Sequence, residues 1–153
     1  MRLWHYKLIS YLPDSQLKAQ WRELNSVFKN QPKHILINYV YTENELCLLT
    51  YAESIICEMK FRGFKISSMD KMRTYFINRG IDINGVFMRH YFLYHDDRYL
   101  TQCFYNLQEK YDGGQKDFTE EQYYKLEKFM RNRFILTPVA IIPKIADKIQ
   151  IKE

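Results

Sequence analysis

The chain has 153 residues, of which 46% are hydrophobic and 27% charged, with only five glycines and four prolines. This composition is that of one ordered globular domain and excludes collagen-like, low-complexity and disordered chains. Three cysteines without C-x-x-C spacing argue against a disulfide framework and a zinc site, so we expect a reducing, cytoplasmic setting. Because no apolar run approaches the roughly 18 residues of a membrane span, and because the opening MRLWHYKLIS is charged, we expect neither a signal peptide nor a membrane anchor.

The net charge of +5 is concentrated at the two ends of the chain. Residues 1–34 contain six basic and two acidic side chains, and residues 120–153 contain seven basic and five acidic ones. The middle, residues 35–119, contains ten basic and eleven acidic side chains. The positive ends could line a surface that faces phosphates, or they could simply solvate helix faces.

The first predicted element is a helix over residues 14–29. Asp14 follows Pro13 and is a suitable N-cap, and apolar residues then recur at helical spacing. This apolar stripe comprises Leu17, Trp21, Leu24 and Phe28. Glu23 lies about 130° around the helix from the stripe, outside the core. Its neighbours on that face are Gln16, Ala19 and Ser26.

A second, longer helix is predicted next. Thr42 and Glu45 fit a capping box at its start, and Gly63 fits its end. Its predicted buried face comprises Leu46, Leu49, Ile56 and Met59. A short helix over residues 68–80 and the turn-rich stretch RGIDING follow.

Two further helices are predicted in the last third of the chain. Asp96 or Asp97 caps the first of them, and the glycines at 113–114 end it. Its inward-facing residues are Leu100, Cys103, Phe104, Leu107 and Tyr111. Thr119 with Gln122 forms a second capping box, which opens a helix that runs to about residue 134.

The last apolar stretch, residues 134–149, is broken by Pro138 and Pro143 and predicts an extended segment packed on the domain surface. No segment alternates with period two for long enough to require a sheet, and there is no internal repeat. The expected fold is therefore all-α: a compact single-domain helical bundle over residues 1–153 with an extended C-terminal segment.

Motifs for most enzyme chemistries are missing from the sequence. The histidines at positions 5, 34, 90 and 95 have no convincing ligand spacing, and adjacent side chains at 95–97 do not converge on one point. There is no G-x-G-x-x-G, no P-loop and no G-x-S-x-G. We therefore expect no metal and no organic cofactor.

Aromatic residues make up 16% of the chain, and several stand beside basic residues. This interleaving suits stacking on unpaired bases next to phosphate contacts. Most of these rings are expected in the core, because Trp21 and Phe28 lie on the buried stripe. Trp4, Tyr6 and Tyr11 are left either to contact a ligand or to pack.

A gapless register of residues runs through the start of the chain. It comprises Leu8, Ser10, Leu12, Asp14, Leu17, Ala19, Arg22-Glu23-Leu24, Val27-Phe28 and Lys33-His34. RGFKI at 62–66, and Leu107 with Glu109-Lys110, extend it over residues 1–112. This register resembles the pyrimidine-dimer DNA glycosylases of the phage endonuclease V type, and the opening MRLWHYKLI is similar to a bacterial branch of that family. Residues 113–153 match less well.

The resemblance implies a compact helical protein that binds duplex DNA, bends it and reaches a damaged nucleotide by flipping a base. In that family the N-terminal amine attacks the anomeric carbon of the sugar, an imine forms, and β-elimination breaks the strand. A terminal amine with a reference pKa of about 7.7–8.0 is roughly a tenth neutral at pH 7, far more than a lysine. The family's glutamate, in an Arg-Glu-Leu motif that Glu23 matches, stabilises the cationic sugar and transfers protons.

Four positions depart from the family pattern. The family's threonine after the initiator methionine is Arg2 here, whose bulk should block the removal of Met1. The arginine that follows the nucleophile falls on Leu3. The histidine early in the first helix is Gln16, and a DNA-contacting arginine is Ser26. We therefore expect the amine of Met1 to be the nucleophile.

The leading hypothesis is a monomeric DNA-repair glycosylase with abasic-site lyase activity on double-stranded DNA containing damaged bases. Met1 and Glu23 are the expected catalytic residues, with the N-terminus within about one nanometre of the Glu23 carboxylate in a basic groove. The expected DNA-binding residues are Arg2, Arg22, Lys18, Gln16 and Ser26. Glu23 could instead be a solvated carboxylate paired with Arg2 or Lys18, and Arg22 a surface charge.

Three alternatives remain open at this stage. Lys7 or another internal lysine could supply the nucleophile in place of Met1. The protein could be a non-catalytic nucleic-acid-binding protein on the same scaffold. It could also be a helical protein-interaction module with no role on DNA.

Overall fold

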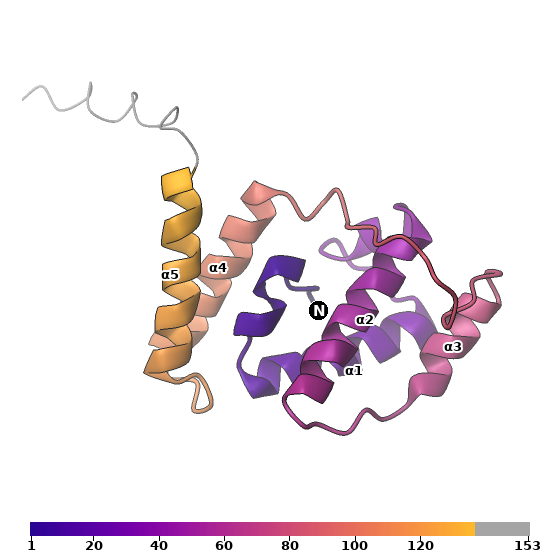
Figure 1. The fold of residues 1–153 in the computed structure, drawn as a ribbon, viewed down its shortest axis with the longest axis horizontal. Helices are drawn as coiled ribbons and strands as arrows, with labels where there is room; N and C mark the ends of the chain where they lie inside the picture. Colours follow the sequence, from indigo (N-terminus) through magenta and orange to yellow (C-terminus); the bar gives the residue numbers. More distant parts are fainter. Residues whose placement is uncertain (137–153) are drawn as a thin grey trace, which may run out of the picture.

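The computed structural model describes the backbone of residues 1–136 and the side chains of residues 1–133, and within this part of the chain it is all-helical with no strand. Figure 1 shows the α-helices, with α5 beside α4 and both set apart from α1, α2 and α3. In chain order the elements are the 3-10 helix η1 (Tyr6–Tyr11), α1 (Asp14–Asn30), the 3-10 helix η2 (Asn38–Tyr41), α2 (Glu45–Phe61), α3 (Met69–Ile77), α4 (Asp97–Asp112) and α5 (Glu120–Leu136). The predicted all-α class is confirmed for the described residues.

Helix α1 buries the predicted apolar stripe and packs against both α2 and α3. The predicted N-cap is wrong by one residue, because Pro13 occupies the cap position and Asp14 is already the first helical residue. The Asp14 carboxylate instead accepts a hydrogen bond from the Arg62 guanidinium at 2.9 Å. In the first turn it still stabilises the positive end of the helix dipole.

Helix α2 passes through the centre of the molecule and buries side chains around most of its circumference. The capping box predicted from Thr42 and Glu45 is wrong, because Asn44 stands directly before the helix and accepts a hydrogen bond from the backbone N–H of Leu46 at 2.9 Å. The Thr42 hydroxyl instead donates to the carbonyl of Tyr39, at the end of η2. The predicted end of the helix is confirmed, since Gly63 follows it with a φ of 80° that glycine adopts without strain.

The caps predicted for the last two helices are confirmed. Asp96 caps α4 and accepts from the N–H of Tyr99 at 2.8 Å. Thr119 and Gln122 form the reciprocal pair of a capping box, at 3.2 and 3.0 Å. Apart from its first three residues, which continue α5, the extended segment predicted for residues 134–149 lies outside the described residues.

In the view of Figure 1 the N-terminus lies between η1 and α2, and Met1 itself is exposed. Helix η1 packs against α2 on one side and against α4 and α5 on the other. Leu3 and Leu8 are completely buried, and Trp4 is only 6% exposed. Cys47 and Cys103 are buried free thiols. No helix in the described part of the chain combines the length and apolar character that crossing a lipid bilayer would require.

Candidate active site

The N-terminal segment is held in place by side chains from distant parts of the chain. The backbone N–H of Arg2 donates to Oε2 of Glu23 at 3.4 Å. Two residues on, the N–H of Trp4 donates to Oε1 of Gln20 at 2.8 Å. The hydroxyl of Tyr51 donates to the carbonyl of Trp4 at 2.8 Å. The first residues are therefore fixed against α1 and α2.

The first residues and α1 together form one wall of a pocket of about 260 Å³. Its lining comprises Met1, Arg2, Trp4, Gln16, Ala19, Gln20, Glu23, Leu36, Asn106 and Lys110. The four α1 residues follow a spacing of three, one and three positions, so they lie on one face of the helix. Lys110 comes from α4, so the lining contains one acidic side chain, Glu23, and two basic ones, Arg2 and Lys110. Met1 and Glu23 thus share one partly basic cavity, as expected from the sequence.

Glu23 is half-buried, and its contacts are specific. Oε2 accepts hydrogen bonds from the backbone N–H of Arg2 at 3.4 Å and from the side-chain amide of Gln20 at 3.1 Å. Lys18, considered above as a partner for Glu23, instead places its ammonium 4.0 Å from the ring centroid of Phe64. The carboxylate is therefore oriented by neutral donors and aimed at the cavity that contains the N-terminus.

Comparison with known protein families gives a match to the part of the chain that contains the first residues and α1. Residues 1–72 match a family model. The family is that of the pyrimidine dimer DNA glycosylases. The match supports the resemblance stated from the sequence, over a shorter stretch than residues 1–112. Neither the curated proteins nor the solved structures contain a match to the chain.

The matched residues 1–72 include both Met1 and Glu23, whereas Asn106 and Lys110 come from α4, outside the match. Gln16 lines the pocket and donates a hydrogen bond to Gln115 at 3.3 Å. The pocket therefore unites four of the seven predicted site residues. They are Met1, Arg2, Gln16 and Glu23.

The other three predicted site residues lie outside the pocket lining. Arg22 is exposed on α1, Ser26 is half-buried one turn further along, and Lys18 is exposed with its ammonium over the ring of Phe64. Exposure leaves Arg22 accessible to a phosphate. The position of Lys18 separates it from the Glu23 side of the helix.

Sequence reasoning missed Gln20 and Lys110. Gln20 lies one helical turn before Glu23, but this position is near the apolar stripe and therefore indicated core rather than site. Lys110 belongs to the register that resembles the family, although no role was derived for it. Their convergence depends on how α4 packs against the N-terminal segment, which local patterns do not encode.

The aromatic residues left open above pack within the protein. The ring of Tyr6 stacks on Tyr91 with centroids 4.4 Å apart, and the ring of Tyr11 stacks on Phe129 at 5.0 Å. Trp4 is buried, at 6% exposure, and is one of the residues that line the pocket. Of the three rings, only that of Trp4 lines the pocket, and those of Tyr6 and Tyr11 are half-buried in aromatic pairs outside it.

Two buried histidines, His5 and His95, hold residues 5–7 in place by hydrogen bonds. Nδ1 of His5 accepts from the N–H of Lys7, so its Nε2 carries the proton and donates to the carbonyl of His95 at 2.7 Å. Nδ1 of His95 accepts from the N–H of Tyr6, and its Nε2–H donates to the hydroxyl of Tyr39 at 2.8 Å. Both rings are therefore neutral, and burial lowers the pKa of His5 to about 4 and that of His95 to about 3.

Tyr99 also holds the N-terminal segment in place by a hydrogen bond. The hydroxyl of Tyr99 donates to the carbonyl of Leu3, and burial raises the pKa of Tyr99 far above its ordinary value, so it remains a donor.

In the described part of the chain, no three His, Cys, Asp or Glu side chains are placed to hold a metal ion.

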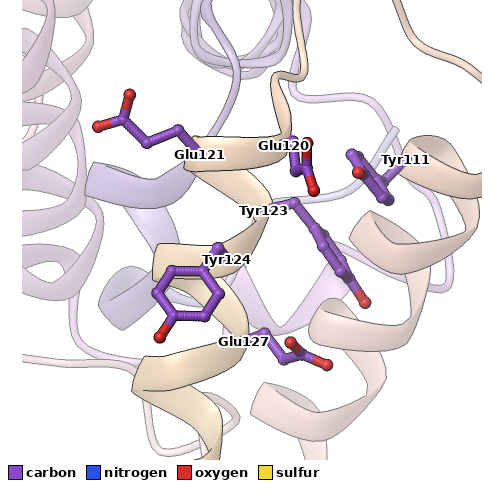
Figure 2. A pocket seen from close by; sticks show the side chains of 6 residues that line it. All are labelled: Tyr111, Glu120, Glu121, Tyr123, Tyr124 and Glu127. Atoms are coloured by element: carbon purple, nitrogen blue, oxygen red, sulfur yellow. The ribbon is translucent and has the colours of Figure 1, made fainter.

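A larger pocket of about 550 Å³ lies between α4 and α5. Figure 2 shows its side chains along the first turns of α5, with Glu120 and Tyr123 on the side of Tyr111 from α4 and with Glu121 and Tyr124 directed away from it. The lining is Tyr111, Glu120, Glu121, Tyr123, Tyr124 and Glu127. The lining contains three carboxylates and no basic side chain, and Glu121 and Glu127 are paired with Lys125 and Arg131 beside it, so the lining itself offers no cationic contact to a phosphate. Charge therefore disfavours this pocket between α4 and α5 as a phosphate-binding site.

Proposed function

We propose that this protein is a DNA-repair glycosylase with an abasic-site lyase step, acting on duplex DNA that contains pyrimidine dimers or similar lesions. One observation carries the proposal: the N-terminal residue and Glu23 share a pocket, and the N–H of Arg2 donates to the Glu23 carboxylate. The amine of Met1 is one residue away, about 3.8 Å along the chain. Both groups can therefore reach one sugar.

In the proposed reaction the neutral amine of Met1 attacks C1′ of the damaged nucleotide. The bond from C1′ to the base breaks, and its electron pair leaves with the base, which takes up a proton. Loss of the amine proton and opening of the sugar ring give an imine between Met1 and C1′. Removal of a proton from C2′ then expels the 3′ phosphate by β-elimination.

Glu23 performs two tasks in this scheme. Its negative charge stabilises the positive charge that develops on the sugar, because the carboxylate is already oriented by its hydrogen bonds before the reaction. It also accepts and returns protons during imine formation and elimination. A half-buried carboxylate suits both tasks, since it combines a reduced dielectric with access to the sugar.

The phosphates on either side of the lesion are bound by basic side chains at the pocket and next to it. Arg2 in the pocket and the exposed Arg22 on α1 take this role, and Gln16 and Ser26 supply polar contacts on the same helix. Lys18 adds positive charge further along the surface. Binding through these contacts should weaken steeply as salt rises.

The test is borohydride trapping on matched duplexes, one with a single pyrimidine dimer, one with an abasic site and one undamaged. We expect a covalent protein–DNA adduct on the two damaged duplexes, and mass analysis should place it on Met1. Release of the base without trapping would indicate a glycosylase without the lyase step. Salt-dependent binding without base release or trapping would indicate a non-catalytic binder and refute the proposal.

A further inference from the structure

Gln20 contacts both Glu23 and the N-terminal segment of the candidate site, and its side chain is buried, at 1% exposure. Its amide nitrogen donates to Oε2 of Glu23 at 3.1 Å and to the carbonyl of Arg2 at 3.2 Å. Its oxygen accepts from the N–H of Trp4 at 2.8 Å and lies 2.9 Å from the hydroxyl of Tyr51, whose single proton is shared between this oxygen and the carbonyl of Trp4. A primary amide has two donors and two acceptor lone pairs, so each of them faces a partner.

The partners allow only one orientation of this amide. If it were flipped, its oxygen would face the Glu23 carboxylate and the Arg2 carbonyl, which are both acceptors. Its nitrogen would face the N–H of Trp4, which is a donor. Burial makes each mismatch costly, because no water is available to replace the lost hydrogen bonds. The orientation of Gln20 is therefore fixed, and its donors point at the site.

We propose that Gln20 is a positioning residue, which holds the Glu23 carboxylate and the N-terminal backbone at a fixed separation so that both act on one sugar. The inference rests on the proposed function for its catalytic consequence. Its structural content, the hydrogen bond from Gln20 to Glu23, is independent of that function. Nothing in the family match assigns a role to this side chain.

A change of Gln20→Glu separates positioning from simple structural support. The new side chain keeps an oxygen for Trp4 and Tyr51 but replaces the donor that faces Glu23 with a second carboxylate oxygen. Two carboxylates about 3 Å apart share one proton, so the pair loses its last proton at a higher pH than an isolated carboxyl does. Activity that needs an ionised Glu23 should then appear only at higher pH.

A second variant, Gln20→Met, removes all four hydrogen bonds and adds no charge. The carboxylate and the N-terminus should lose their fixed separation. We expect the rate of the chemical step to fall about 10- to 100-fold, with little change in DNA affinity, because Gln20 itself is buried. Asn30→Asp is the matched control, since it makes the same amide-to-acid change at the exposed end of α1.

The experiment measures single-turnover cleavage of a dimer-containing duplex from pH 5 to 9 for the parent and the three variants, with thermal melts of each. In the same proteins, ¹³C NMR follows the side-chain carboxyl carbon of Glu23 through the pH titration. We expect the acid limb of the rate profile to move up by about one pH unit or more in Gln20→Glu. The profile of Asn30→Asp should match that of the parent.

The NMR readout keeps failure of the inference distinct from failure of the proposed function. If the parent does not act on damaged DNA, the proposed function fails, and a two-step titration of the Glu23 carbon in Gln20→Glu still supports the positioning contact. A Glu23 titration in Gln20→Glu that matches the parent would overturn the inference. So would a rate for Gln20→Met that, corrected for the folded fraction, equals the parent rate.

Discussion

Replacing His95 with asparagine should reduce by half the contribution of the buried histidines to acid unfolding. His5 and His95 are 1% and 6% exposed, and burial lowers their pKa values from 6.5 to about 4 and about 3. Both rings also use Nδ1 as a hydrogen-bond acceptor, which protonation would abolish. In the unfolded chain neither constraint exists, and both histidines regain the ordinary pKa.

The sign of the effect follows from proton binding. Below pH 6.5 the unfolded chain protonates both histidines, whereas the folded protein stays neutral at them until the pH approaches 4 for His5 and 3 for His95. Because the unfolded state binds more protons, stability is complete above pH 6.5 and decreases as the pH falls. Each histidine contributes about 1.4 kcal/mol per pH unit, and together they should remove about 5 kcal/mol by pH 4.5.

The assay is urea denaturation at pH 7.0, 5.5, 5.0 and 4.5. Asparagine at position 95 keeps an acceptor for the N–H of Tyr6 but cannot be protonated. Between pH 5.5 and 4.5 the free energy of unfolding of His95→Asn should therefore fall by about 1.4 kcal/mol less than that of the parent. His34→Asn is the control, because His34 is exposed and the change should leave the slope unaltered. Equal slopes for the parent and His95→Asn would refute the neutral, buried state of this ring.

Four further outcomes are expected. Glu23→Gln keeps an acceptor for the donors of Glu23 but removes the negative charge. Single-turnover cleavage of a dimer-containing duplex should therefore slow about 10²- to 10⁴-fold, without a change in thermal melting. An unchanged rate would show that Glu23 is only a surface charge. Acetylation of the terminal amine should abolish borohydride trapping, and an adduct that survives acetylation and maps to Lys7 would contradict the assignment of the nucleophile. Tyr51→Phe removes the hydroxyl whose single proton is shared between two buried acceptors, the Trp4 carbonyl and the Gln20 oxygen, and should cost about 1 to 3 kcal/mol in urea denaturation. Thr119→Ala removes the N-cap oxygen of α5 and should cost about 1 kcal/mol, seen as a fall of about 2 to 4 °C in Tm.

Most of the helices could be predicted from the sequence because their signals are local. Apolar residues at helical spacing located α1, and the pair of Thr119 and Gln122 located the start of α5. The two capping errors arose where neighbouring residues compete for the same role. Asn44 rather than Thr42 caps α2, because Asn44 directly precedes the helix. The Asp14 carboxylate pairs with Arg62, which is 48 residues away along the chain.

The site was partly predictable for a different reason. The register that resembles the glycosylase family named Met1 and Glu23, and helical geometry placed Gln16 on the same face as Glu23. The sequence by itself thus determined the helical class, the start of α4 at Asp96 or Asp97, the capping box of α5, the off-core position of Glu23 and the resemblance of the N-terminal part to the pyrimidine dimer DNA glycosylases, whose family model matches residues 1–72. Each of these depends on residues within a few turns of one another or on a contiguous motif.

Only the tertiary structure decided which distant groups meet around the N-terminal segment. Gln20 and Tyr51 meet at Trp4 from different helices, and His5 meets His95 across 90 residues of chain. Hydrogen bonds of this kind form only after the helices have packed, and packing depends on the shapes of all contacting side chains at once. Periodicity therefore shows which face of a helix is buried, whereas the fold determines which buried donor reaches which acceptor.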